Sequence, residues 1–209
     1  MKKNYTTDQE DFWAGNFGEE YIDRNTVEKL LSTNLWFFSK ALDRVENLSS
    51  VIEFGPNIGA NLVTLHYLFP ELESSGVEIN EKAANMLKKS LPQSKIYNES
   101  ILDFELNKKY DLSLIKGVLI HQDPSVLDEI YKKLYKLSNK YILIAEYYNP
   151  SPVEIEYRGN KGKLFKRDFA GEFLTKFDDV KLIDYGFAYK KDPKAPQDDI
   201  TWFLFTKNN

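Results

Sequence analysis

Residues 51–61 combine a carboxylate and two glycines in a pattern that suits a nucleotide-like ligand. An apolar run that contains Glu53 leads into Gly55, Asn57 and Gly59. Neither glycine has a Cβ atom, so the backbone can bend sharply and lie close to a ligand. A strand, a glycine-bearing turn and the start of a helix in this order therefore predict a cofactor site.

A second carboxylate, Glu78, lies 19 residues after Gly59, where an acid accepts hydrogen bonds from ribose hydroxyls. The spacing of Gly55 and Gly59 departs from the G-x-G-x-x-G pattern of nicotinamide dinucleotide sites. The charge of Glu53 would also repel a pyrophosphate beside the turn. A cofactor with an amine, a ribose and no phosphate fits better, and S-adenosylmethionine has this composition.

Five further side chains are candidates for work on a substrate. His121 follows the fourth predicted strand, where it either takes a proton from an oxygen or nitrogen acceptor or orients its loop through a backbone hydrogen bond. Tyr147 and Tyr148 follow the fifth strand and are candidates for catalysis or for orienting the substrate. Arg158 and Lys163 lie in the loop beyond and suggest an anionic substrate, unless they only form a solvated loop.

These residues need a sheet that brings strand ends together. Apolar runs alternate with helix-period segments, which predicts an α/β fold with an open, mostly parallel, doubly wound sheet. Strands are expected at about 50–54, 74–79, 94–98, 110–117 and 141–146, with an antiparallel pair at 180–185 and 200–205. Helices are expected at about 59–69, 81–91, 124–137 and 166–177. Ligands bind outside the carboxyl ends of such strands.

The N-terminal residues 1–45 are predicted as a helical cap on a core of residues 46–209, with a substrate loop at 148–165. Helices are expected at about 5–24 and 25–44, the second capped by Asn25 or Thr26. Tyr21 and Arg24 lie one turn apart, so the first helix can act as a lid whose arginine binds a carboxylate. Alternatively, its aromatic residues only pack it onto the body. The 209 residues suit one domain.

Composition limits the possible partners. A net charge of −4 disfavours binding to nucleic-acid backbones. The chain has no cysteine and two histidines, so no metal site is expected. No apolar stretch approaches the ~18 residues that span a membrane, and no secretory signal is visible. We therefore expect a soluble, cytoplasmic protein that acts on a small molecule, of unknown oligomeric state.

The order of these motifs resembles that of class I S-adenosylmethionine-dependent methyltransferases. The resemblance is carried by the motifs Glu53-x-Gly55-x-Asn57-x-Gly59, Glu78, Ser100-Ile101-Leu102-Asp103 and Asp111 followed by Gly117-Val118-Leu119-Ile120-His121. It implies a Rossmann-like fold with seven strands, an antiparallel strand near the C-terminus, and methyl transfer from S-adenosylmethionine.

The resemblance also implies a role for each motif. Gly55, Asn57 and Gly59 would pass under the methionine part of the cofactor, and Glu53 would lie near its amino group, in contact through backbone or water. Glu78 would hold the ribose, and its neighbour Ile79 would also contact the cofactor. The methionyl group would lie beside Lys116 and Gly117. Ser100 and Ile101 would contact the adenine edge. Many members have Asp at the position of Ser100, so the contact to the adenine amine is either weaker here or supplied by Glu99.

Segments near both ends resemble a small methylase family associated with pseudaminic acid biosynthesis. They are residues 12–25, 146–150, 157–159 and 163–170, and the resemblance implies a sugar or sugar-acid substrate without fixing the acceptor atom. We expect methylation on oxygen or nitrogen of a sugar, a sugar acid or its nucleotide-linked precursor. Two alternatives stay open, an NAD(P)-dependent sugar oxidoreductase and a non-catalytic cofactor-binding protein of the same fold. The sequence does not identify the acceptor atom.

Overall fold

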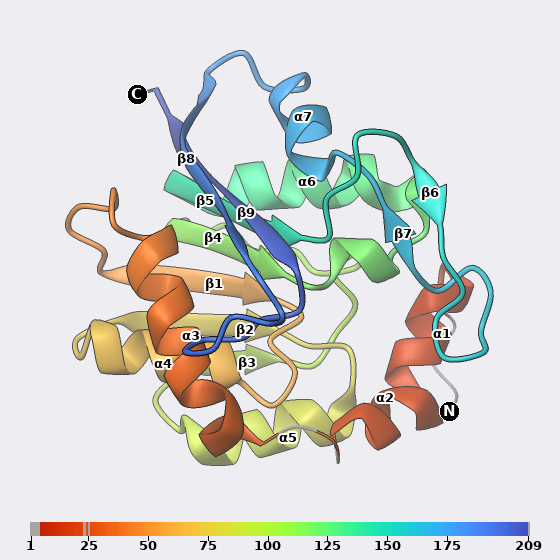
Figure 1. Ribbon diagram of the computed structural model, residues 1–209. Coiled ribbons are helices and arrows are strands. Elements are labelled where there is room, and N and C mark those ends of the chain that lie inside the picture. The colour runs from red at the N-terminus through yellow and green to blue at the C-terminus, as the bar shows by residue number, and fades with distance from the viewer. Residues whose placement is uncertain (1–4, 23, 25, 209) are drawn as a thin grey trace.

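A computed structural model describes residues 5–22, 24 and 26–208, and a seven-stranded sheet forms its centre (Figure 1). The strand order is β3-β2-β1-β4-β5-β9-β8. The strands are β1 (Ser50–Phe54), β2 (Glu73–Val77), β3 (Lys95–Tyr97), β4 (Tyr110–Lys116), β5 (Ser138–Glu146), β8 (Val180–Ala188) and β9 (Ile200–Lys207). Strands β1 to β5 pair in parallel, and β9 is antiparallel to both β5 and β8. The predicted doubly wound sheet is confirmed.

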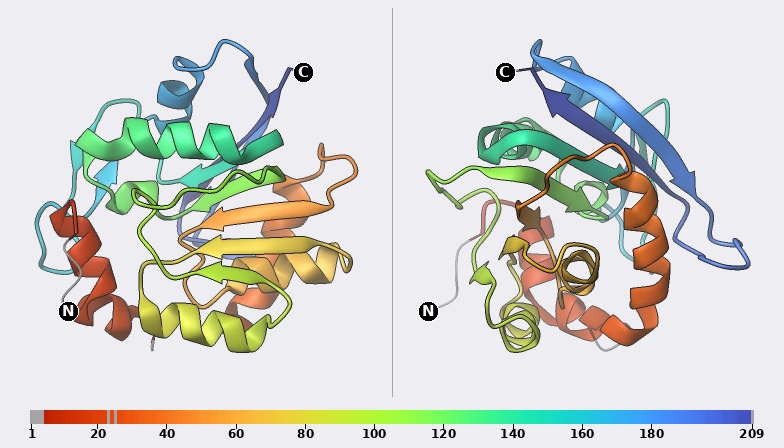
Figure 2. Two further views of the ribbon diagram at one scale, coloured as in Figure 1. Left: turned by 180° about the vertical axis from the view of Figure 1, so that it is seen from behind. Right: turned by 90° about the vertical axis from the view of Figure 1, so that its left-hand side faces the viewer.

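Helices cover both faces of the sheet (Figure 2). Helices α3 (Val27–Ala41), α4 (Ala60–Leu68) and α5 (Glu81–Ser90) pack on one face, and α6 (Leu127–Leu137) and α7 (Phe169–Leu174) on the other. Alternate residues of β1 serve the two cores, since Val51 packs with α3 and α4 while Ile52 and Phe54 pack with α6. Burial on both faces explains why the central strands are apolar runs.

The N-terminal segment forms two short helices where the sequence suggests one. Helices α1 (Asp8–Ala14) and α2 (Asn16–Ile22) are separated at Gly15. The side chains of Thr7 and Glu10 form a reciprocal capping box that fixes the start of α1. Thr26 caps α3, with its hydroxyl accepting from the N–H of Lys29. The other predicted cap, Asn25, lies outside the described residues.

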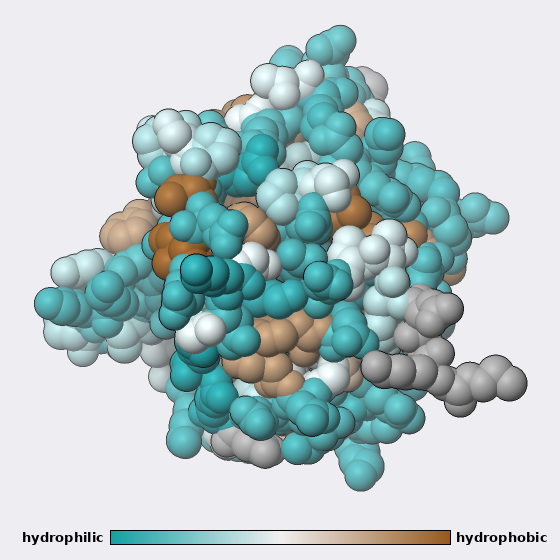
Figure 3. Space-filling view, turned by 90° about the vertical axis from the view of Figure 1, so that its right-hand side faces the viewer, coloured by the Kyte–Doolittle hydropathy of each residue, from teal (hydrophilic) through white to brown (hydrophobic). Residues whose placement is uncertain are grey.

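The predicted substrate loop packs beside α1 (Figure 1). It contains a short antiparallel pair of β6 (Val153–Glu154) and β7 (Phe165–Lys166). The short helices η1 (Leu119–His121) and η2 (Pro124–Val126) follow β4. Figure 3 shows the side of the molecule that lies at the right of Figure 1. Most of this surface is hydrophilic, with hydrophobic residues in small groups. None of the described helices has both the length and the apolar character that crossing a membrane requires.

Candidate functional site

A cavity of about 220 Å³ opens at the carboxyl ends of β1, β2 and β4. Its walls come from the turn after β1, the ends of β2 and β4, the segment after β3, helices α1 and α2, and the connection between β8 and β9. Strand order places these pieces side by side, because β3, β2, β1 and β4 are consecutive neighbours in the sheet. This is the edge at which ligands bind in sheets of this kind.

Ten of the predicted site residues line this cavity. They are Tyr21, Gly55, Asn57, Glu78, Ile79, Ser100, Ile101, Lys116, Gly117 and His121. Seven others are not part of its wall, namely Arg24, Glu53, Gly59, Tyr147, Tyr148, Arg158 and Lys163. The structure therefore brings together most of the residues predicted for the cofactor, but few of those predicted for the substrate.

In the turn after β1, Gly55 and Gly59 each lie against a different neighbouring side chain that leaves no room for a Cβ atom. Both have positive φ angles, +70° at Gly55 and +87° at Gly59, as a sharp turn demands. A Cβ atom on Gly55 would come within 2.6 Å of the Val118 side chain, at the cavity wall. A Cβ on Gly59 would overlap with Cδ1 of Leu87 in α5, so Gly59 serves helix packing instead of the cavity.

Every backbone N–H of this turn already has an acceptor within the protein. The N–H groups of Gly55 and Gly59 donate to backbone carbonyls of Val77 and Pro56, each at 2.9 Å. The N–H of Ile58 donates to Oδ1 of Asn57 at 2.7 Å, and that of Asn57 donates to a carboxylate. Pro56 has no N–H. Within the turn, no backbone N–H is left for a phosphate.

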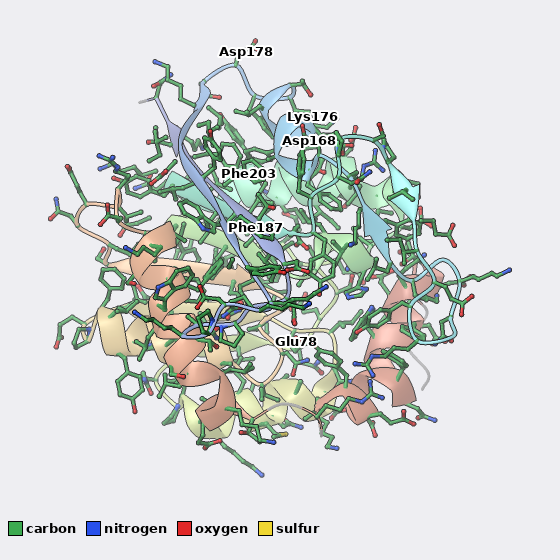
Figure 4. The ribbon with its side chains drawn as sticks, in the orientation of Figure 1. Glu78, Asp168, Lys176, Asp178, Phe187 and Phe203 are labelled. Atoms are coloured by element: carbon green, nitrogen blue, oxygen red, sulfur yellow. The ribbon has the colours of Figure 1, made fainter. Side chains whose placement is uncertain are left out.

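The carboxylate that accepts from Asn57 belongs to Glu78, immediately after β2. Its Oε2 lies 2.7 Å from the Asn57 nitrogen, and its Oε1 lies 2.8 Å from the nitrogen of Asn80. The side chain is 6% exposed, and burial raises its pKa to about 6 although these hydrogen bonds favour the charged form. Figure 4 shows Glu78 beyond the arrowheads of the central strands. Each oxygen keeps acceptor capacity for a ligand hydroxyl.

Glu53 lies behind the cavity wall, so its side chain does not face the cavity directly. Its side chain is fully buried in β1, where Oε1 accepts from Nδ2 of Asn61 at 2.6 Å. Its Oε2 has no partner among the described residues. Burial raises the pKa of Glu53 to about 7, and the nearby charge of Lys116 acts in the opposite direction. Glu53 is therefore joined to the cavity wall through its hydrogen bond with Asn61, which lines the cavity.

Amide side chains extend this polar wall from Glu53 to the surface. Asn34 of α3 donates to Oδ1 of Asn61 at 3.1 Å, and Gln197 donates to Oδ1 of Asn34 at 3.1 Å. Lys116 is the one lysine or arginine among the described residues of the cavity wall. Its burial lowers its pKa, and its Nζ lies 5.3 Å from the ring centre of Phe37. This side of the cavity suits a polar ligand end with a carboxylate.

His121 lies at the other side of the cavity, in a ring cluster. Its ring centre is 4.6 Å from that of Trp13 and 4.8 Å from that of Tyr157. Its Nδ1 lies 2.6 Å from the carbonyl oxygen of Lys163, so Nδ1 carries the hydrogen and Nε2 keeps a lone pair. Burial lowers its pKa to about 4. Both predicted roles are compatible with this geometry, because one nitrogen orients the loop and the other is left for a substrate.

The backbone that carries His121 is held by a carboxylate that the sequence analysis did not select. Glu146 ends β5, and its Oε1 accepts from the N–H groups of Val118 and Leu119 at 2.9 and 2.8 Å. Its Oε2 accepts from the N–H of Ile120 at 3.4 Å. Its position as an acidic residue at the end of a predicted strand was the feature of the sequence that could have identified it. Glu146 is thus a positioning residue for η1.

Two predicted binding residues have other partners. The guanidinium of Arg24 lies 3.7 Å from the carboxylate of Glu20 and 5.6 Å from the ring of Phe17. The Nζ of Lys163 donates to the carbonyl of Asp8 at 3.0 Å and lies over the ring of Phe12 at 5.0 Å. Arg24 therefore does not reach the cavity, and Lys163 fastens the substrate loop to α1.

The three remaining residues predicted for the substrate lie outside the cavity wall. Tyr148 is 44% exposed and packs at 6.2 Å from Phe203, which lies on β9 well away from Glu78 (Figure 4). Arg158 is exposed at the tip of its loop, with a φ of +51°. Tyr147 is half-buried under Nζ of Lys166, and burial raises the pKa of its phenol.

Helix α1 supplies three cavity residues that the sequence analysis missed, Gln9, Glu10 and Trp13. Gln9 donates to the carbonyl of Gly162 at 2.9 Å, and Asn80 donates to the carbonyl of Trp13 at 3.1 Å. Helix α1 is thus fastened both to the segment after β2 and to the predicted substrate loop. The pattern Thr7-x-x-Glu10 signals a helix start but gives no information about what α1 covers.

Comparison with known proteins agrees with the fold. No protein-family model matches the chain. The uncharacterized protein RP028 of Rickettsia prowazekii (strain Madrid E) is 29% identical over 110 residues, which are 50% of this chain. The match spans 44% of that relative, less than half of its length.

Three solved structures illustrate the likeness of fold. The 1,6-didemethyltoxoflavin-N1-methyltransferase of Burkholderia thailandensis, with bound S-adenosylhomocysteine, has a TM-score of 0.73 and 13% identity, covering 100% of this chain and 94% of its own. Magnesium protoporphyrin IX methyltransferase from Synechocystis PCC 6803 has a TM-score of 0.69 and 14% identity, covering 96% and 100%. The plantazolicin methyltransferase BpumL has a TM-score of 0.67 and 16% identity, covering 96% and 94%. The chain has the Rossmann-like fold of class I methyltransferases.

Proposed function

We propose that the protein transfers a methyl group from S-adenosylmethionine to a small molecule. The observation that carries this proposal is the internally bonded turn of Gly55 to Gly59, with the carboxylate of Glu78 against it. A pyrophosphate would find no free backbone N–H in the turn and would meet a negative charge. A cofactor that offers hydroxyls and an amine instead finds acceptors there.

The residues of the cavity fit the parts of this cofactor in order. Glu78 accepts from the ribose hydroxyls, and Gly55 gives room for the chain that joins ribose to sulfur. Lys116 binds the methionyl carboxylate, since Arg24 lies outside the cavity wall. When bound, S-adenosylmethionine supplies a methyl group that its positive sulfur makes electrophilic.

The protein's main contributions are alignment and the handling of one proton. Holding two reactants in line is worth about 7–11 kcal/mol in favourable cases. His121 offers Nε2 as the acceptor for a proton that leaves an oxygen or nitrogen of the substrate. Its lowered pKa keeps the ring neutral near pH 7, so this lone pair is available before the reaction.

We retain a sugar or sugar acid as the proposed acceptor. The ring of Trp13, which lines the cavity beside His121, supports it, because an aromatic face can pack against the face of a cyclic molecule. Arg158 and Lys163 were the reason to expect an anionic acceptor, and neither is part of the described cavity wall. We therefore propose a cyclic acceptor and assign it no charge.

Binding assays test the cofactor directly. We expect S-adenosylhomocysteine to raise the melting temperature and to bind in calorimetry, while NAD and NADP do neither. Binding of NAD or NADP alone would favour an oxidoreductase and overturn the proposal. Methyl-labelled S-adenosylmethionine and small-molecule fractions of a cell extract then test the reaction. S-adenosylhomocysteine binding without label transfer to any fraction would indicate a non-catalytic cofactor-binding protein.

A further inference from the structure

Glu10 is buried more deeply than a helix cap requires. As the third residue of α1 it closes the capping box, with Oε2 accepting from the N–H groups of Thr6 and Thr7 at 2.9 and 2.8 Å. A carboxylate in this role normally lies at the surface. Glu10 is instead 5% exposed and lines the cavity.

The second oxygen of Glu10 faces the body of the protein. The hydroxyl of Ser100, in the segment after β3, donates to Oε1 of Glu10. Among the described residues no lysine, arginine or histidine pairs with this carboxylate, although a buried charge is costly without strong partners. Oε1 has this one hydrogen bond and therefore keeps acceptor capacity. A ligand that donates a hydrogen bond to Oε1 of Glu10 would give this buried carboxylate a further partner.

Strand order shows which end of the ligand reaches Glu10. From β4 to β3 the cavity edge presents Lys116, the turn at Gly55, Glu78 and then Ser100. With the methionyl end at Lys116 and the ribose at Glu78, the base lies against Ser100 and Ile101. Asn98 fixes this segment to the end of β2 by donating to the carbonyl of Glu78 at 2.9 Å.

Adenine matches the polar groups at this end of the cavity. Its exocyclic amine is a donor, and the neighbouring ring nitrogen N1 is an acceptor. Glu10 presents an acceptor, and the backbone N–H of Ile101 donates to no acceptor in the described part of the chain. Hypoxanthine reverses both groups, because it has an oxygen in place of the amine and a hydrogen on N1. A site built for one pattern rejects the other.

We infer that Glu10, from the N-terminal helix, binds the adenine amine and sets the selectivity for adenine. This inference rests on the proposed function. Helix α1 is then part of the cofactor site, and it supplies the carboxylate that is absent at position 100. Glu99 is the competing source of a carboxylate, but it is not part of the cavity wall.

The test compares two ligands by calorimetry, S-adenosylhomocysteine and its analogue with hypoxanthine in place of adenine. We expect the wild type to bind the adenine form about 100-fold more tightly or better. Glu10→Gln should lower the ratio of the affinity for the adenine form to that for the hypoxanthine form about 10-fold or more. The reason is that an amide can donate to the hypoxanthine oxygen. Glu99→Gln should leave the ratio unchanged.

Thr7→Ala separates the helix from the carboxylate. It removes the other half of the capping box and weakens the start of α1, but it keeps Glu10. We expect its ratio to equal that of the wild type. An unchanged ratio in Glu10→Gln, or a lowered ratio in Glu99→Gln, would overturn the inference and leave the proposed function intact. Failure of the wild type to bind S-adenosylhomocysteine would overturn both.

Discussion

The backbone N–H of Asn57 donates to the carboxylate of Glu78, with 2.7 Å between the nitrogen and Oε2. This bond joins the turn after β1 to the end of β2, two strands that lie side by side in the sheet. One carboxylate therefore holds the turn in shape and faces the cavity. Ligand binding and turn geometry depend on the same side chain.

Glu78→Gln should weaken S-adenosylhomocysteine binding about 10-fold or more, because the amide loses the charge and one of two acceptor oxygens. Isothermal calorimetry measures this change. Glu71→Gln is the matched control, since Glu71 is exposed and lies before β2. Equal affinity in Glu78→Gln and the wild type would show that Glu78 makes no contact with the cofactor.

The two glycines with positive φ at positions 59 and 159 should respond differently to alanine. Both φ angles strain an alanine, at +87° and +82°. A Cβ at Gly59 overlaps with Leu87, whereas a Cβ at Gly159 has no atom within 4 Å. Urea unfolding should show a loss of about 1–2 kcal/mol for Gly159→Ala and a clearly larger loss for Gly59→Ala. Similar losses would mean that α5 moves away to accommodate the methyl group.

Local patterns were sufficient to predict the sheet and the residues that line the cavity at the ends of β1 and β2. The apolar run before Gly55 and the acid at Glu78 are separated by one strand-helix unit, so their meeting follows from topology. The N-terminal residues that face the cavity could not be predicted in the same way. The spacing of Tyr21 and Arg24 does not determine which side of α2 faces the body, and only Tyr21 lines the cavity.

The role of charged side chains also escaped the sequence analysis, because their partners are distant in the chain. Lys163 donates to the carbonyl of Asp8, and Ser100 donates to Glu10. Glu53 was predicted beside the ligand from its place before the turn, but alternation along β1 directs it into the core under α4. Tertiary docking, not local pattern, sets these contacts.

His121→Ala should leave S-adenosylhomocysteine affinity within about 3-fold and lower methyl transfer by about 100-fold or more, because a positioned base contributes about 10²–10⁴-fold. The measurement uses the acceptor found with the labelled cofactor. His66→Ala is the control, since His66 lies in α4 and bonds to Ser74 away from the cavity. Unchanged methyl transfer in His121→Ala would assign the ring to loop orientation alone.

Glu53 should make the protein less stable as the pH rises. Burial raises its pKa from 4.5 to about 7, so the folded state binds more protons than the unfolded state between these values. Stability is then lost from pH 4.5 up to about pH 7, by on the order of 3 kcal/mol for a shift of this size.

Glu53→Gln resembles the protonated acid at every pH. We expect it to melt several degrees higher than the wild type at pH 8 and at nearly the same temperature at pH 5. Glu71→Gln, at an exposed carboxylate, should follow the wild type at both values. Parallel pH profiles for Glu53→Gln and the wild type would contradict the predicted shift.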